Sequence, residues 1–214
     1  MLGIANAHCS KDASLAVLTP QELKIAGQYS GSRYEEFVTA RYITKRAVQN
    51  LVENVAMDEI QVSKGVFEQP VLEMLTRHFQ YDVSISHKEN ITGSLVFPRT
   101  HPVGIDIEST SLRNSNTLKR VTTGHEQQIC GGDNASMMVV YSAKEALSKI
   151  LRCGFTVPLH LLEVKRLAYR QDLYSGVFVN FSQYRFLSFF ANGYVLTLVF
   201  PRNSACTIEM ALST

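Results

Sequence analysis

One short block near the middle of the chain constrains the fold and the chemistry more than any other feature. It is V-G-I-D-I-E, residues 103–108, in which apolar residues alternate with the others. This period of two predicts a strand, and it places Asp106 and Glu108 on the same face of that strand. Two neighbouring carboxylates on one face are oxygen ligands of the kind that a hard divalent cation prefers.

A second block, Y-S-A-K-E-A-L-S-K at residues 141–149, predicts the start of a helix. Glu145 and Lys149 are four positions apart, so they share a face of that helix. A third carboxylate near the strand would complete a cation site, since Mg²⁺ keeps several waters and shares substrate phosphates. The lysine one turn further on is suited to hold a phosphate.

Together the two blocks resemble the signature of the 4′-phosphopantetheinyl transferase superfamily. The resemblance is strongest to its larger, two-lobed type, which serves siderophore, peptide and polyketide carrier proteins. Two upstream blocks agree with it: an S-x-S-H strand that ends at His87, and a G-x-x-x-x-P segment from Gly65 to Pro70. Four blocks in the same order span residues 60 to 150, roughly, which makes the joint match specific.

The resemblance implies an α+β fold. It would be a pseudo-dimer of two similar lobes, each a helix packed on a small antiparallel sheet, with the active site in the cleft between them. The order of elements is consistent with an N-terminal lobe at residues 1–102, which contacts the nucleotide, and a C-terminal lobe at residues 103–214, which carries the metal and catalytic motifs. We find no residue-level repeat between the two halves.

The resemblance also implies the chemistry. The protein would transfer the phosphopantetheine arm of coenzyme A to a serine of an apo acyl or peptidyl carrier protein, with Mg²⁺ (Mn²⁺ as the alternative), and release adenosine 3′,5′-bisphosphate. Asp106, Glu108 and Glu145 would bind the metal, with Glu145 also activating the nucleophile. Lys144 and Lys149 would bind the phosphates of coenzyme A, and Lys149 is also a catalytic candidate.

Three further residues are implied at the nucleotide end of the cofactor. In the S-x-S-H strand, Ser86 and His87 are cofactor-binding candidates, and the histidine is assigned to the 3′-phosphate. An F-x-x-x-R segment gives Phe37 and Arg41. Arg41 suits a phosphate because its guanidinium is planar and can bind two oxygens at once.

Each assignment has an ordinary structural alternative. Ser142 and Glu145 form an S-x-x-E capping box, and Glu145 with Lys149 could be a plain helix-surface pair. Asp106 and Glu108 could be the solvated face of a half-buried strand. Arg41 and its basic neighbours could be a solvated helix face. Glu126 lies where relatives often have an acidic residue, and the alternative is a plain glutamate on the helix surface.

The expected elements follow from periodicity and from turn residues. They are a helix at 34–55, a strand and loop at 60–70, a helical turn at 71–79, strands at 82–86, 91–97 and 103–108, a weak helix at 117–129, a helix at 135–151, and strands at 161–167, 176–181, 185–190 and 194–200. Asn192-Gly193 predicts a two-residue hairpin turn between the last two strands.

Composition limits the alternatives. The net charge is +2 with 21 Lys and Arg against 19 Asp and Glu, which does not give the clustered basic surface of a nuclease or another nucleic-acid-binding protein. The four cysteines fit no zinc template, and no segment has the length of a membrane span. We expect a cytoplasmic monomer of secondary metabolite biosynthesis. A Mg²⁺-dependent nuclease or other phosphotransfer enzyme, and a non-catalytic scaffold that binds carrier proteins, remain alternatives.

Overall fold

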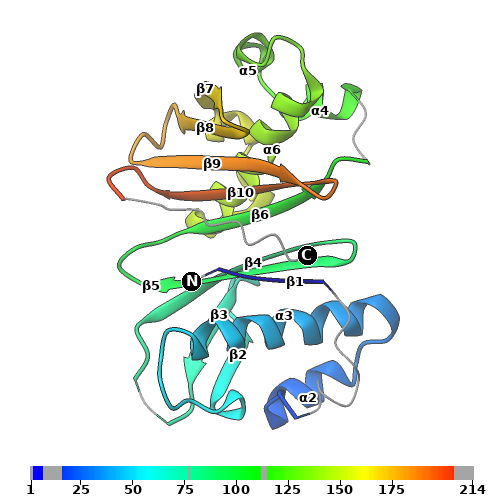
Figure 1. Ribbon diagram of the computed structural model, residues 1–214, viewed down its shortest axis with the longest axis vertical. Coiled ribbons are helices and arrows are strands. Elements are labelled where there is room, and N and C mark those ends of the chain that lie inside the picture. Colours follow the sequence, from blue (N-terminus) through cyan, green and yellow to red (C-terminus); the bar gives the residue numbers. More distant parts are fainter. Residues whose placement is uncertain (1, 7–15, 77, 112–114, 205–214) are drawn as a thin grey trace.

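The computed structural model describes residues 2–6, 16–76, 78–111 and 115–204 (Figure 1). The chain combines helices with antiparallel sheets, which agrees with the predicted α+β class. The described strands form three sheets, ordered β1-β5-β4, β2-β3 and β6-β10-β9-β8-β7. Every strand pairing joins two strands from the same half of the chain, and the boundary between the halves lies just before β6.

In the first half a long helix packs against the small sheet. Helix α3 lies on β5 and β1, and the β2-β3 hairpin extends the layer beside it (Figure 1). Apolar residues of α3, such as Ala47 and Val48, share a buried core with strands β2 to β5. The elements are β1 (Leu2–Asn6), α2 (Pro20–Ala26), α3 (Gly31–Gln49), the 3-10 helix η1 (Met57–Glu59), β2 (Ile60–Lys64), β3 (Pro70–Met74), β4 (Tyr81–Lys88) and β5 (Ile91–Pro98).

The second half repeats this plan with a larger sheet. Helix α6 packs on β6 and β10, and apolar side chains from α6 and strands β7 to β10 fill the largest buried core. The elements are β6 (Gly104–Ser109), α4 (Ser115–Val121), α5 (Gly124–Ile129), α6 (Asn134–Leu151), the 3-10 helices η2 (Gly154–Thr156) and η3 (Leu159–Leu162), β7 (Val164–Arg170), β8 (Leu173–Phe178), β9 (Tyr184–Ala191) and β10 (Tyr194–Pro201).

The two halves meet where β4 lies beside β6 (Figure 1). Strand β6 is at the edge of its sheet, so its outer backbone N–H groups need other acceptors. Two serines of β4 supply them: Ile105 N donates to Ser84 Oγ and Ile107 N to Ser86 Oγ, both at 3.1 Å. The S-x-S spacing therefore fits one serine to every second residue of β6.

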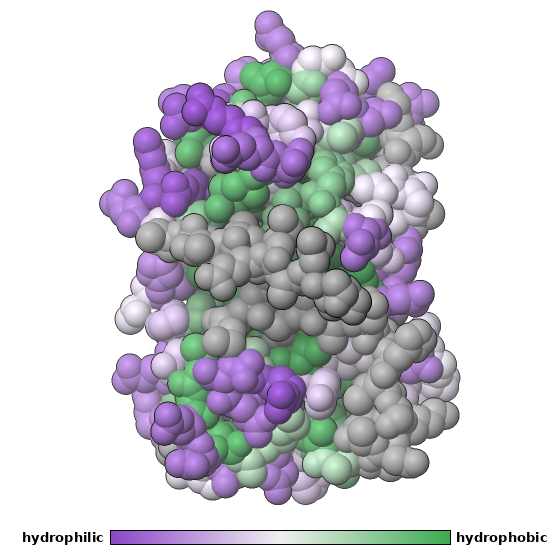
Figure 2. All heavy atoms as spheres, in the orientation of Figure 1, coloured by the Kyte–Doolittle hydropathy of each residue, from purple (hydrophilic) through white to green (hydrophobic). Residues whose placement is uncertain are grey.

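Apolar packing completes this junction. On β5, a Cβ atom at Gly93 would lie 2.8 Å from Cδ1 of Ile107 and 3.0 Å from Cδ1 of Ile105. Only a residue without a side chain lets these two isoleucines approach β5 so closely. In the view of Figure 2, apolar residues are visible above and below the central band, among hydrophilic residues.

Most of the expected elements are present, and two expectations were wrong. Residues 70–74 form strand β3 rather than a helical turn, because Leu72 and Met74 point into the core while Glu73 between them is exposed. The weak helix at 117–129 is two helices, separated where Thr123 caps the second of them. The hairpin at Asn192-Gly193 is confirmed, and both residues have the positive φ that a two-residue turn of this kind needs.

A residue-level repeat exists, so the statement that there is none was wrong. The pentapeptide Leu-Val-Phe-Pro-Arg occurs at residues 95–99 and again at residues 198–202. Both copies end a strand of the same kind, since β5 pairs with β1 and β4 whereas β10 pairs with β6 and β9.

A buried ion pair is repeated as well. In the first half, Lys45 Nζ lies 2.6 Å from Glu22 Oε2 and 2.7 Å from the carbonyl oxygen of Val17. Glu22 also accepts hydrogen bonds from the backbone N–H groups of Thr19 and Val62, at 2.9 Å each. Burial lowers the pKa of Lys45, and the contact with Glu22 opposes that effect.

In the second half, Lys144 Nζ lies 2.6 Å from Glu126 Oε2 and 3.1 Å from the carbonyl oxygen of Val121. Glu126 accepts from the backbone N–H groups of Thr123 at 2.7 Å and Val164 at 2.8 Å. Each contact corresponds to one in the first half. In both halves a Thr-x-x-Glu capping box begins the short helix, and its glutamate joins that helix to the long helix and to a strand.

Candidate active site

Asp106 is the centre of a buried polar cluster between β6 and α6. Its side chain accepts hydrogen bonds from Ser142 Oγ at 2.8 Å and Ser86 Oγ at 3.1 Å, and Lys149 Nζ lies 2.9 Å from Oδ1. The residue is 4% exposed, which rules out the solvated strand face as its explanation. Charge-assisted contacts of this kind hold a carboxylate in one orientation.

Lys149 joins the helix to the strand. Its Nζ donates to the carbonyl oxygen of Ile105 at 2.8 Å as well as to Asp106. The close approach depends on Gly104, where a Cβ atom would lie 2.2 Å from the carbonyl oxygen of Ala146. The glycine of the first motif therefore brings the helix of the second motif against the strand.

Glu145 lies on the same side of α6 and has an unusual environment. Tyr141 Oη donates a hydrogen bond to Glu145 Oε1. Burial raises the pKa of Glu145 to about 7, the charges of Asp106 and Glu108 add to the rise, and Tyr141 and Lys149 oppose it. The charges of two predicted metal ligands, Asp106 and Glu108, therefore act on the third.

The capping-box explanation of Ser142 and Glu145 was wrong. Helix α6 begins at Asn134, and its first turn is capped by Asp133, whose side chain accepts from Ser136 N at 2.8 Å. Ser142 and Glu145 are thus in the interior of the helix. Lys149 pairs with Asp106 and not with Glu145, so the helix-surface pair is also absent.

Glu108 is close to the cluster, and Lys88 Nζ of β4 lies 2.9 Å from its Oε2. Among the residues that the structure describes, no three His, Cys, Asp or Glu side chains are arranged so that they could hold a metal ion. The oxygen donors have the chemistry that Mg²⁺ requires, but Asp106 and Glu108 are engaged by lysines. Metal binding by Asp106, Glu108 and Glu145 therefore stays a prediction.

The structure corrects the role of Lys144. Its side chain is fully buried, its ammonium is held by Glu126 and Val121, and it does not line the cavity beside Lys149. It is a structural residue rather than a phosphate ligand. Glu126 is likewise fully buried, so it is not a helix-surface glutamate.

Ser86 is also placed differently from the prediction. Its hydroxyl lies between Ile107 N and Asp106 Oδ1, and the side chain is 4% exposed. The structure gives Ser86 a positioning contact in place of the predicted cofactor contact.

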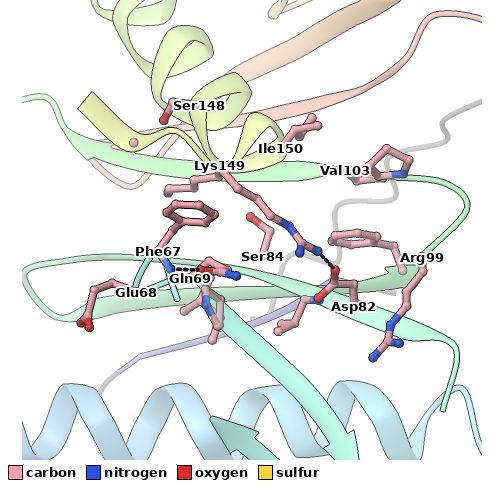
Figure 3. Close-up of a pocket in the computed structure, with 17 residues that line it drawn as sticks. Phe67, Glu68, Gln69, Asp82, Ser84, Arg99, Val103, Ser148, Lys149 and Ile150 are labelled. Carbon is pink, nitrogen blue, oxygen red and sulfur yellow. Dashed lines mark hydrogen bonds and ion pairs between the residues drawn. The ribbon is translucent and has the colours of Figure 1, made fainter. Parts of the chain in front are cut away.

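A cavity of about 290 Å³ opens beside this cluster, between the two halves (Figure 3). Lys149 extends from α6 on one side, and Phe67 and Gln69 of the turn between β2 and β3 lie on the other. Ser84 forms part of the floor. The cavity is closed at one end by an ion pair between Arg152, which follows α6, and Asp82 of β4.

A second cavity of about 270 Å³ continues from the first, because Glu68, Pro70 and Ile85 line both. Arg41 and His87, which the sequence assigned to the nucleotide end, both line this second cavity. The structure thus brings together two residues that are far apart in the sequence. The G-x-x-x-x-P segment forms the wall between the two cavities.

The guanidinium group of Arg41 has a buried donor that an anion could satisfy. Its Nε is buried without a hydrogen-bond partner, and its guanidinium carbon lies 3.4 Å from the ring centre of Phe37. Burial lowers the pKa of Arg41 to about 10. His87 is exposed, with Nε2 at 3.5 Å from Glu36 Oε2. An anionic ligand here would satisfy Arg41 and would compete with Glu36 for His87.

Comparison with known families identifies the second half of the chain. A family model described as ACPS, the 4′-phosphopantetheinyl transferase superfamily, matches residues 102–199. The matched segment is just under half of the chain, and it holds both central motifs. The resemblance inferred from the two central motifs is confirmed, since both lie within the matched residues.

Three solved structures of the holo-acyl-carrier-protein synthase kind are similar to part of the chain. The structure from Bacillus anthracis, in complex with CoA (3′,5′-ADP), is 27% identical in sequence. The similarity covers 44% of this chain and 91% of the Bacillus chain, with a TM-score of 0.39. The structure from Helicobacter pylori, in complex with coenzyme A, is 16% identical over 46% of this chain and 99% of the Helicobacter chain, with a TM-score of 0.37. The structure from Thermotoga maritima is 18% identical over 49% of this chain and 67% of the Thermotoga chain, with a TM-score of 0.37. No curated protein matches the chain significantly.

The match to the transferase superfamily covers β6 to β10 and leaves out most of the first half. Asp106, Glu145 and Lys149 thus lie within it, whereas Arg41 and His87 do not. In the described part of the chain, no helix has the length and apolarity needed to cross a membrane.

Sequence reasoning missed Ser142, Lys45 and the ion pair between Asp82 and Arg152. Ser142 was considered only as a helix cap, although a serine one turn before a predicted catalytic glutamate faces the same strand. The two Thr-x-x-Glu boxes were visible in the sequence, at Thr19 and Thr123. The contact across the halves had no local signal.

Proposed function

We propose that this protein transfers the 4′-phosphopantetheine arm of coenzyme A to a serine hydroxyl of an apo carrier protein. Adenosine 3′,5′-bisphosphate would be the second product. The observation that carries the proposal is the cluster of Asp106 and Lys149, because it lies within the segment that matches the superfamily and borders a cavity of about 290 Å³.

The two connected cavities suggest how coenzyme A would bind. Lys149 would contact the pyrophosphate, since its side chain lines the cavity next to Asp106. Arg41 and His87 would bind the nucleotide end, in the cavity on the other side of the segment from Glu68 to Pro70. A phosphate group would satisfy the buried Nε of Arg41.

Asp106, Glu108 and Glu145 would hold a Mg²⁺ ion, which would neutralise charge on the pyrophosphate during transfer. The effect of the Asp106 and Glu108 charges on Glu145 supports this assignment, because a cation would relieve that repulsion. Lys88 and Lys149 would then shift from their carboxylate partners toward phosphate oxygens or solvent.

The chemical step is a displacement at the phosphorus atom that carries the pantetheine arm. The serine oxygen of the carrier protein forms a bond to this phosphorus, and the bond from phosphorus to the oxygen of the leaving bisphosphate breaks. Glu145 would take the serine proton, with Tyr141 orienting its carboxylate. Lys149 would stabilise the charge that develops on the leaving oxygen.

We further propose that the chain is the larger, two-lobed type, with lobes at residues 1–102 and 103–214 that arose by duplication. The repeated pentapeptide, the repeated strand pairing and the repeated buried ion pair all support this. One chain would then supply both walls of the site. We expect full activity in a monomer, and activity found only in an oligomer by light scattering would contradict this.

The function can be tested by mass spectrometry. The protein is mixed with coenzyme A, Mg²⁺ and several apo carrier proteins, and the expected result is the addition of one phosphopantetheine to a serine of at least one carrier. Lys149→Met should abolish the mass increase, whereas Lys165→Met, an exposed lysine on β7, should not. If the wild-type protein binds a carrier protein without any mass increase, the proposal is wrong and the protein is a non-catalytic scaffold.

A further inference from the structure

The second half of the chain has a cavity whose lining corresponds to the wall that the first half gives to the active-site cavity. It is lined by strands β7, β8 and β9 and by the turn after β10, and its volume is about 440 Å³. The pentapeptide repeat relates the two cavities: Arg99 of the first corresponds to Arg202 of the second. We call the second one the β7–β9 cavity.

Strand pairing extends this correspondence. Asp82 is paired with Phe97 of β5, and Arg185 is paired with Phe200 of β10, so Asp82 and Arg185 hold equivalent positions. In the first cavity Asp82 forms an ion pair with Arg152. In the β7–β9 cavity the acidic residue is therefore replaced by a basic one.

The charge of the β7–β9 cavity is wholly positive. Arg166, Arg185 and Arg202 line it, and none of its lining residues is acidic. Within the described part of the chain, these three arginines form no ion pair with Asp or Glu. The active-site cavity, in contrast, is lined by both Glu68 and Asp82.

Arg185 is the best-defined of the three. Its Nε is buried without a hydrogen-bond partner, Nη2 donates to the carbonyl oxygen of Ser204 at 2.8 Å, and its guanidinium carbon lies 4.9 Å from the ring centre of Phe200. The guanidinium is thus held in place on an aromatic ring while one of its donors still lacks an acceptor. A buried donor without an acceptor is costly, and an anion would supply one.

We propose that the β7–β9 cavity is a second anion-binding site, which takes a small molecule through its pyrophosphate or phosphate groups. Three guanidinium groups around one concave surface provide paired N–H donors that match the geometry of phosphate oxygens. The volume is that of a small-molecule pocket. This site does not depend on the proposed transferase function.

The predicted metal site has no counterpart in the first half. Ser94 and Thr197 immediately precede the two pentapeptides, and they pair with Gly3 and Asp106 respectively. By the same register Ala5 corresponds to Glu108. The first half therefore has no carboxylates at the positions where the second half carries its predicted metal ligands.

Equilibrium dialysis with radiolabelled pyrophosphate, in chelator and at low salt, tests the proposal. The active-site cavity is first weakened by Arg41→Gln and Lys149→Met. The remaining binding should be lost on adding Arg166→Gln and Arg202→Gln, with a decrease of about tenfold for each arginine. The charge-matched control is Arg120→Gln with Arg170→Gln, two exposed arginines outside the cavity, and it should bind as before.

Equal binding by the cavity variant and the control would overturn the proposal, as would binding of an acidic peptide but not of pyrophosphate. Thermal unfolding shows whether the variants are folded. If Arg166→Gln with Arg202→Gln destabilises the fold, the single Arg202→Gln variant replaces it, with the same tenfold decrease expected. The transferase assay is separate, because dialysis uses no carrier protein. A negative transferase assay would not affect the proposal of an anion site, and a negative dialysis result would not affect the proposal of a transferase.

Discussion

Lys149 Nζ lies 2.9 Å from Asp106 Oδ1, and this contact helps to join helix α6 to the edge strand β6. Ser86 of β4 and Ser142 of α6 donate to the same carboxylate. Strand β4 comes from the first half of the chain, and β6 and α6 come from the second. The position of the cluster is therefore fixed by both halves.

Asp106→Asn should lower both activity and stability. The amide keeps the size of the side chain but replaces one acceptor oxygen by a donor, so Lys149 or a serine loses its partner. Leaving a buried group unsatisfied costs about 1–3 kcal/mol. Urea unfolding should show this decrease in the free energy of unfolding, and transfer should be abolished at limiting Mg²⁺. The exposed Asp58→Asn is the control, and an Asp106→Asn variant with normal turnover would exclude Asp106 as a metal ligand.

Much of this cluster could be predicted from the sequence because its signals are local. The alternation in residues 103–108 predicted a strand with Asp106 and Glu108 on one face, and the structure has both on the side of β6 nearest α6. The shared cavity of Arg41 and His87 agrees with their predicted common role. Neither residue has local sequence features that indicate a shared cavity, so this prediction depended on the family resemblance.

Lys144 shows where the motif was read too literally. With 3.6 residues per turn, side chains five positions apart point about 140° away from each other, so Lys144 and Lys149 could not both face the same phosphates. Glu145 and Lys149 differ by only about 40°. Helical geometry alone could have separated the structural lysine from the one in the cavity. Glu126, the partner of Lys144, is distant from it in the sequence and could not be identified without the fold.

The buried pair of Glu126 and Lys144 should dominate the stability of the second half. Glu126→Gln would leave the Lys144 ammonium buried without a counter-charge, and breaking such a pair costs about 3–5 kcal/mol. Urea unfolding measures the loss. The double change Glu126→Gln with Lys144→Met should recover most of it, because no charge is then buried.

The first half supplies a matched control for this experiment. Glu22→Gln should destabilise by a similar amount, since Glu22 and Lys45 make the same contacts and are also fully buried. A Glu126→Gln variant as stable as the wild type would show that Lys144 finds another partner. The assignment of Lys144 as a purely structural residue would then be withdrawn.

Cys130 should be unreactive at neutral pH. Burial raises the pKa of its thiol to about 11, and the charge of Glu126 adds to the rise. Only the thiolate is nucleophilic, and at pH 8 a fraction on the order of 10⁻³ of the thiol is in that form, so the reaction should be slow. Iodoacetamide labelling with peptide mapping should show slow modification that accelerates as the pH rises toward 11. Rapid labelling of Cys130 at pH 7 would contradict the burial.

The same thiol gives the sign of a stability change with pH. Its pKa is higher in the folded state than the ordinary value of 9.0, so the folded protein retains a proton that the unfolded chain loses. The stabilisation is complete below pH 9 and is lost as the pH rises through the folded pKa. Cys130→Ala should remove this part of the alkaline decrease in the free energy of unfolding.

His87→Ala should weaken the binding of coenzyme A more than it slows the chemical step. The histidine lines the cavity with Arg41, away from Asp106 and Lys149, which line or border the other cavity. Dephospho-coenzyme A lacks the 3′-phosphate, so the variant should discriminate less between the two donors in kcat/KM. The exposed His78→Ala is the control and should keep the wild-type preference. An unchanged preference in His87→Ala would remove the 3′-phosphate assignment.

Glu145→Gln separates the catalytic from the structural role of α6. Glutamine keeps the size of the side chain and an oxygen that can accept from Tyr141, and Glu145 is not part of the helix cap. The free energy of unfolding should therefore stay close to that of the wild type. If Glu145 binds metal and takes the serine proton, turnover should fall by at least the ~10²–10⁴ that is typical of losing a general base.

The measurement combines single-turnover transfer to an apo carrier protein with thermal unfolding of the same preparation. Glu163→Gln is a useful comparison, because Glu163 accepts a hydrogen bond from Thr123 Oγ1 far from the cavity between the halves. Its variant should transfer at the wild-type rate. Near-normal turnover of Glu145→Gln with unchanged stability would remove Glu145 from the mechanism. Serine deprotonation would then have to come from another group next to Asp106, and Tyr141 and Lys149 would be the next residues to change.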